Sequence, residues 1–145
     1  MAERSKPALG LVVLSGDVER VHYALAMAAA AAAVGRPTVL LFTMGGLKAL
    51  AAGNGDGPGW HGLDPAADGA TPAERDRALT AAGVAGFEEL LVALPAMGAK
   101  LYACEMGMRA IGLGREDLRA DVAVAEGGIV TFLAEAGPDG QIAVI

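Results

Sequence analysis

Along this chain of 145 residues, short segments made only of apolar residues alternate with segments whose apolar residues recur at the spacing of a helix. Residues 9–14 (LGLVVL) and 39–42 (VLLF) are typical of strands buried on both faces of a parallel sheet. Between them, an apolar and alanine-rich pattern from Val18 to Ala33 predicts a helix, and Gly35 follows as its stop signal. A strand, a helix and a strand with short connections form a right-handed parallel crossover.

The rest of the chain repeats this alternation, with a capping box at 71–74 (TPAE). A chain of this length fits one domain. We therefore predict a single α/β domain over residues 1–145, an open and mostly parallel sheet of about five strands with helices on both faces. The further strands are expected at 100–103, 122–125 and 141–145, and the further helices at 47–52, 87–94, 105–111 and 128–136.

Residues 53–70 (GNGDGPGWHGLDPAADGA) interrupt the pattern and contain the one tryptophan, Trp60. Gly, Pro and Asp dominate this segment. A loop of this length inside a compact domain is usually functional or mobile. We predict a flexible Gly/Pro-rich loop over 53–70, without regular secondary structure.

Charge and composition limit the partners. The formal net charge is −6, so the chain has no electrostatic attraction to phosphate backbones or anionic lipid, and we expect no nucleic-acid or membrane partner. The longest apolar run, 23–34, is shorter than the about 20 residues of a membrane span. With one cysteine and no secretory pattern at the N-terminus, the chain is predicted to be cytoplasmic. Few aromatic and many small residues predict close packing and apolar surface buried between subunits, hence a homo-oligomer.

Small residues follow several expected strands at the edge where ligands bind in an open parallel sheet. Helices begin just behind them, and backbone N–H groups at helix N-termini favour negative charge. We predict a pocket at this edge, lined by Ser15, Gly16, Thr43, Gly45, Gly127 and Gly128.

Cys104 follows the strand expected at 100–103 and is the one strong nucleophile at this edge. A helix N-terminus favours the reactive thiolate, whereas the acidic neighbours Glu105 and Glu126 favour the neutral thiol. The alternative is a buried and inert thiol, because free cysteine is among the most buried residue types.

Several cysteine chemistries are excluded by the residues present. A C-x-x-C redox site needs a second cysteine, and the spacing from Cys104 to Arg109 is one residue short of a C-x5-R phosphate loop. A Cys–His hydrolase needs a base; we expect His22 on a helix surface and His61 solvated in the loop, from where it could also swing over Cys104. Metal-ligand spacings and phosphate-binding glycine motifs are missing, so we expect no metal ion and no cofactor. A lone thiolate suits a carrier of sulfane sulfur, held as a persulfide.

Three segments resemble the DsrE/DsrF-like family: 97–108 (MGAKLYACEMGM), 111–118 (IGLGREDL) and 126–133 (EGGIVTFL). The LFTMGGL segment at 41–47 is also similar to that family. The resemblance implies a flavodoxin-like sheet and cytoplasmic homo-oligomers, commonly trimers or hexamers. It further implies sulfur relay beside rhodanese-like and TusA-like proteins, with the persulfide on the family cysteine, whose position Cys104 occupies.

Two other functions remain open. In a small-ligand-binding module, the crevice would hold an anionic metabolite or nucleotide and Cys104 would only pack. A scaffold subunit of a sulfur-transfer assembly would do no chemistry. A fast-reacting thiol favours the carrier, and a buried, unreactive thiol favours the other two.

Overall fold

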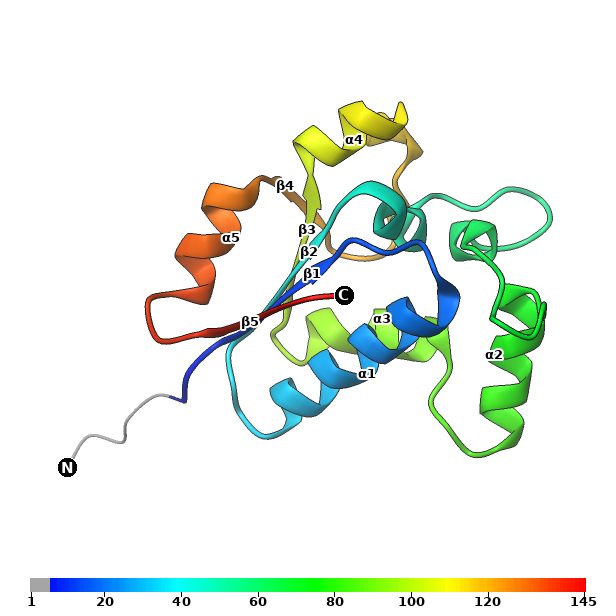
Figure 1. Cartoon of the computed structure of the whole chain (residues 1–145), viewed down its shortest axis with the longest axis horizontal. Helices are drawn as coiled ribbons and strands as arrows, with labels where there is room; N and C mark the ends of the chain where they lie inside the picture. The colour runs from blue at the N-terminus through cyan, green and yellow to red at the C-terminus, as the bar shows by residue number, and fades with distance from the viewer. Residues whose placement is uncertain (1–5) are drawn as a thin grey trace.

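Five parallel strands form the centre of the molecule, in the order β4-β3-β2-β1-β5 (Figure 1). The structure is a computed structural model that describes residues 6–145. The predicted α/β sheet of about five strands is confirmed. Its strands are β1 (Leu9–Val13), β2 (Thr38–Phe42), β3 (Lys100–Cys104), β4 (Ala125–Gly127) and β5 (Gln141–Val144). The α-helices are α1 (Val18–Ala33), α2 (Pro72–Ala81), α3 (Phe87–Ala96), α4 (Glu105–Ile111) and α5 (Ile129–Ala136), and the 3-10 turns are η1 (Met44–Leu50), η2 (Gly59–Gly62) and η3 (Arg115–Asp117).

The handedness of the crossovers places the helices. The chain moves from β1 to β2 to β3 in one direction across the sheet, so the right-handed crossovers put α1 and α3 on the same face. From β4 it returns across the whole sheet to β5, so α5 lies on the opposite face (Figure 1). Helix α4 lies beyond the ends of the strands, against η1. The described residues thus place two packed helices on one face of the sheet and one helix on the other.

Side chains alternate between two unequal cores. Odd-numbered β1 residues such as Leu11 join the large core with α1 and α3, together with Phe42 and Leu101. On the other face, α5 covers a small cluster of five buried residues. Its members are Val39, Leu41, Cys104, Phe132 and Ala136.

Several expected elements shift in the structure. The strand expected at 122–125 is wrong in its bounds: β4 covers Ala125–Gly127, and Val122 is instead buried in the large core. The helix expected at 47–52 is a 3-10 turn that begins at Met44. This turn packs tightly on β1, since a Cβ built on Gly46 would lie 2.1 Å from the carbonyl oxygen of Val13. The capping box at Thr71 is confirmed.

Trp60 anchors the middle of the Gly/Pro-rich segment 53–70. The segment was expected to lack regular structure, but it forms η2 and buries Trp60 in the large core. The indole ring stacks on Phe87 with ring centroids 4.6 Å apart, and its Nε1 donates a hydrogen bond of 2.7 Å to Glu88. The partners that order this segment therefore come from α3, about thirty residues away along the chain.

Arg119 ties the same region to the connection before β4. Its guanidinium donates hydrogen bonds of 2.6 and 3.0 Å to Glu88 and of 2.7 and 2.8 Å to Asp121. These bonds hold the pKa of Asp121 at about 2, below its ordinary 3.8, and also lower the pKa of Glu88. In the described part of the chain, no helix is long and apolar enough to span a membrane.

Replacing Trp60 with alanine should lower the free energy of unfolding by about 3–5 kcal/mol, because a buried aromatic side chain and its packing are lost. Urea denaturation followed by circular dichroism measures the change. Tyr23→Ala, which removes a largely exposed aromatic from α1, is the matched control and should change stability by less than about 0.5 kcal/mol. Equal midpoints for the two variants would contradict the anchoring role of Trp60.

Stability should fall as the pH drops from about 4 toward 2. The folded-state pKa of Asp121 lies below the unfolded value, so its contribution is complete above the unfolded pKa and is lost as the pH falls through the folded one. In urea titrations across this range, Asp121→Asn should show a shallower loss than the wild type. Asp139→Asn, on the exposed turn before β5, serves as the control and should keep the wild-type slope. The same slope in all three proteins would contradict this assignment.

Candidate functional site

Cys104 occupies the junction between a strand and a helix. It was expected just after the strand, but it is the last residue of β3, paired in register with Gly127 of β4. It is also the N-cap residue of α4, with extended backbone angles. The pairing with β4 extends β3 by one residue, and it places the thiol at the carboxyl edge of the sheet, where sequence reasoning expected it.

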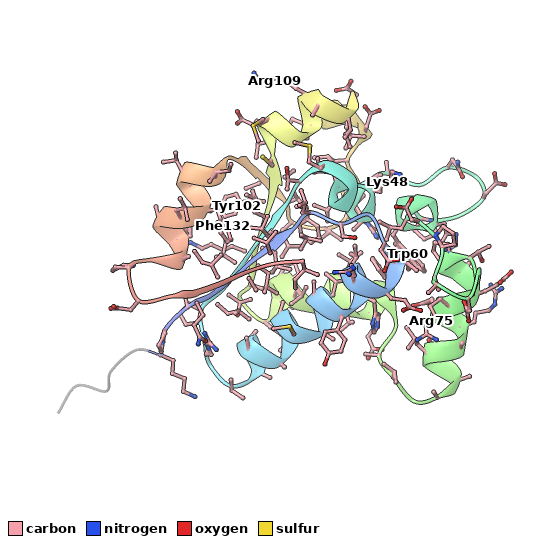
Figure 2. The ribbon with its side chains drawn as sticks, in the orientation of Figure 1. Lys48, Trp60, Arg75, Tyr102, Arg109 and Phe132 are labelled. Atoms are coloured by element: carbon pink, nitrogen blue, oxygen red, sulfur yellow. The ribbon has the colours of Figure 1, made fainter. Side chains whose placement is uncertain are left out.

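The thiol is enclosed: Cys104 is only 1% exposed. It lies on the α5 face of the sheet in the small cluster, in which Phe132 of α5 is the largest side chain. Tyr102 precedes Cys104 by two residues and therefore points to the same face, where it packs against this cluster. Figure 2 shows Tyr102 and Phe132 together between α5 and the sheet.

Helix α5 covers this cluster. Two kinds of contact attach the helix to the sheet. The ring of Phe132 sits against Gly10 of β1, where a Cβ would lie 2.8 Å from the ring. On the side facing β3, Glu135 accepts hydrogen bonds of 3.0 and 3.1 Å from Lys100 and one of 3.1 Å from the hydroxyl of Tyr102. The bonds from Lys100 lower the pKa of Glu135, while burial and the bond to Glu135 raise the pKa of Tyr102.

Two predicted pocket residues, Gly127 and Gly128, lie beside this cover. A Cβ on Gly127 would lie 2.8 Å from the ring of Tyr102. Glycine at this position therefore lets β4 pack closely against the tyrosine ring. Gly128 is the N-cap residue of α5, and Gly137, with a φ of +72°, follows the end of the helix. Glycines therefore flank α5 at both ends.

Thr43 directly follows β2, and it lies beside Cys104 because the preceding residues, Phe42 and Ala103, are paired in register. Its hydroxyl is buried and has no hydrogen-bond partner within residues 6–145. Gly107 of α4 packs directly on it, since a Cβ there would lie 2.3 Å from the hydroxyl oxygen. Thr43, Cys104 and Gly127 thus lie along the ends of three adjacent strands.

The remaining predicted residues form a tightly packed turn over the ends of β1 and β2. The hydroxyl of Ser15 accepts a 3.0 Å hydrogen bond from the backbone of Asp17. A Cβ on Gly45 would lie 2.9 Å from the nitrogen of Gly16, and the carbonyl of Gly16 accepts a 2.8 Å bond from Asp64. Gly16 therefore contacts both Gly45 and segment 53–70 through its backbone, and the hydroxyl of Ser15 is used within the same turn.

A hollow of about 440 Å³ lies next to the site, where the pairing of β3 with β4 begins at Tyr102 and Ala125. Lys100, Leu101 and Tyr102 form its β3 side, and residues 123–125 form the opposite side. Tyr102 thus lines this hollow and also packs against the Cys104 cluster.

The histidines belong to the large-core side of the molecule. His22 was expected on a helix surface but is buried, with its Nε2 2.9 Å from the carbonyl oxygen of Ala85. His61 packs edge-on against Trp60. Their aromatic neighbours, Phe87 and Trp60, belong to the large core and not to the small cluster around Cys104. Among the described residues, no three His, Cys, Asp or Glu side chains are grouped as a metal site would require. Chemistry at Cys104 would therefore depend on the thiol itself and on what uncovers it.

Sequence reasoning missed Tyr102, Phe132 and Glu135. The spacing of Tyr102 from Cys104 within one strand was a usable signal, because residues two apart share a face. The contacts of Phe132 and Glu135 depend on where α5 packs against the sheet, and that position is set by residues distant in the sequence.

These features define a three-layer α/β protein with a covered thiol at the carboxyl edge of its sheet. The model of the DsrE/DsrF-like family matches residues 9–137, and the chain belongs to that family. A protein of unknown function, MTH1491 from Methanobacterium thermoautotrophicum, has a similar structure, with a TM-score of 0.62 and 13% identity over 97% of this chain and 100% of that one. The ychN protein from E. coli is similar with a TM-score of 0.58 and 12% identity, over the same shares of the two chains. No curated protein matches the sequence.

Alkylation of Cys104 should be slow in the folded protein and should become faster when α5 is loosened. Removing the exposed ion pair with Glu135→Ala should cost about 0.5–1 kcal/mol of local stability, which corresponds to about a two- to fivefold faster reaction. Iodoacetamide labelling followed by intact-mass spectrometry measures the rate. Glu19→Ala breaks an ion pair with Arg75 that involves α1 and α2 instead, and should leave the rate unchanged. Fast labelling of the wild type would contradict the burial of the thiol.

Proposed function

We propose that this protein is a sulfur carrier that holds sulfane sulfur as a persulfide on Cys104. The observation that carries the proposal is the position of the chain's one thiol, at the carboxyl end of β3, in an apolar cluster under a single helix. Membership of the DsrE/DsrF-like family supports it, because the family resemblance implies sulfur relay through this cysteine.

The transfer requires no base fixed next to the thiol. The Cys104 thiolate attacks the outer sulfur of a donor persulfide, R–S–SH; the S–S bond of the donor breaks, and R–S⁻ leaves. A partner thiolate later attacks the outer sulfur of the Cys104 persulfide, and the Cys104 thiolate is the leaving group. One S–S bond forms and one breaks in each step, so no external oxidant or reductant is consumed.

Enclosure by the small cluster suits storage between these steps. A persulfide surrounded by Leu41, Phe132 and Ala136 is kept from water and from small reducing thiols. Loading and unloading then require α5 to move. The flanking glycines Gly128 and Gly137 supply flexible joints at its two ends, and one exposed ion pair crosses its edge.

The proposal includes protein partners. Because α5 covers the thiol, the sulfur donor and the sulfur acceptor are expected to displace α5 when they dock. Rhodanese-like and TusA-like sulfur-transfer proteins in the cytoplasm are the partners that the family resemblance implies. The acceptor must present a thiol on an extended or mobile segment to reach the end of β3.

The burial of Cys104 also supports a second function, in which the thiol only packs and the protein binds a small ligand or acts as a scaffold. Fully buried free cysteines are commonly inert. The hollow of about 440 Å³ beside Tyr102 is the site where such a ligand would be sought.

Intact-mass spectrometry after incubation with polysulfide separates the two functions. The wild type should gain one or more sulfur atoms that dithiothreitol removes, and Cys104→Ser should gain none. Glu135→Ala should load faster than the wild type, because the cover is loosened, whereas Glu19→Ala should not. A wild type that stays unloaded, while the denatured chain loads, would contradict the carrier function and favour the packing role.

A further inference from the structure

A buried hydroxyl group without a hydrogen-bond partner lies at the end of β2. Thr43 is only 6% exposed, and its Oγ1 has no partner within residues 6–145, the sulfur of Cys104 included. Thr43 is the N-cap residue of η1, where a threonine side chain commonly accepts a hydrogen bond from the first turn, but it makes no such bond. Buried hydroxyl groups in native proteins nearly always have a partner, so the unpaired Thr43 requires an explanation.

This hydroxyl group and the thiol lie on the same face of the sheet and at the same edge. Leu41 of β2 belongs to the small cluster with Cys104, whereas Phe42 belongs to the large core. The backbone of Thr43 is extended, so the alternation continues and its side chain points to the α5 face. Because Phe42 and Ala103 are paired in register, the next residues of the two strands, Thr43 and Cys104, lie side by side.

The surrounding backbone fixes the position of Thr43. Its N–H donates a 3.0 Å hydrogen bond to the carbonyl oxygen of Val13. Gly107 of α4 packs on the side chain, since a Cβ there would lie 2.3 Å from the hydroxyl oxygen. The next residue, Met44, has a φ of +48°, which residues other than glycine rarely adopt. The turn therefore holds the hydroxyl group at the edge of the Cys104 cluster and leaves its hydrogen-bonding capacity unused.

The rest of the cluster offers little to stabilise a negative charge on sulfur. Its other buried members are apolar: Val39, Leu41, Phe132 and Ala136. The hydroxyl group of Tyr102, which packs against the cluster, already donates its hydrogen bond to Glu135. An anion in apolar surroundings needs a hydrogen-bond donor. Of the described residues around Cys104, Thr43 is the one whose buried hydroxyl group is still free to donate.

We propose that Thr43 is a sulfur-binding residue, whose hydroxyl group donates a hydrogen bond to the outer sulfur of the Cys104 persulfide. This inference rests on the proposed carrier function and adds a residue to its site. The S–S bond lengthens the cysteine side chain by about 2 Å, and an ionised persulfide carries its charge on the outer sulfur. The hydrogen bond stabilises the loaded protein relative to the unloaded one, and it transfers no proton. The site thereby takes sulfur from small persulfides that lack such a donor.

Equilibration with fixed mixtures of glutathione persulfide and glutathione, followed by intact-mass spectrometry, gives the ratio of loaded to unloaded protein. This ratio does not depend on how fast α5 opens. Thr43→Val should lower it about tenfold, the size of one hydrogen bond to a charged group, whereas Thr43→Ser retains the hydroxyl group and should keep a ratio close to that of the wild type. In urea denaturation, Thr43→Val should be at least as stable as the wild type, because the hydroxyl group that it removes is unpaired.

Thr38→Val is the matched control, since Thr38 is a 5% exposed threonine at the other end of β2. Its hydroxyl group donates a 3.0 Å hydrogen bond to the carbonyl oxygen of Arg36, so the variant should lose stability and keep the wild-type loading ratio. The inference alone is overturned by an unchanged ratio in Thr43→Val, by an equal fall in Thr38→Val, or by a fall in Thr43→Ser as large as that in Thr43→Val. A wild type that stays unloaded overturns the carrier function and this inference together.

Discussion

The right-handed return from β4 to β5 is the constraint on which the rest of this structure depends. It carries the chain back across the whole sheet, and among residues 6–145 it leaves α5 as the one helix on the face opposite α1 and α3. One helix is too narrow to cover five strands. The face is therefore divided into a covered half, which contains Cys104, and an open half formed by the ends of β1 and β5.

The covered half buries the thiol with few contacts. Burial of Phe132 contributes about 1.5–3 kcal/mol, while the exposed bonds of Glu135 add at most about 1 kcal/mol. The proposed function requires α5 to open at a free energy below that of global unfolding. The large core with Trp60 and Leu91, which lies on the other face, would then keep the rest of the fold intact.

The parts that sequence predicted well depend on local patterns. Buried strands such as 39–42 appear as uninterrupted apolar runs, and the capping box at Thr71 is set within four residues. The parts it missed depend on distant partners. Segment 53–70 reads as a loop, yet Phe87 and Glu88 hold Trp60 in the core. Strand β4 begins three residues later than expected, and Val122, the first residue of the expected strand, packs in the large core instead.

By itself, the sequence determined the strand and helix order, the family and the position of one thiol at the carboxyl edge of the sheet. The alternation of apolar runs and helical patterns is enough for that, since it is encoded in neighbouring residues. Only the tertiary structure decided that Cys104 is covered, that Phe132 and Glu135 hold the cover, and that Val144 is left exposed. These outcomes depend on which face each crossover reaches, because burial is a property of packed layers and not of any single segment.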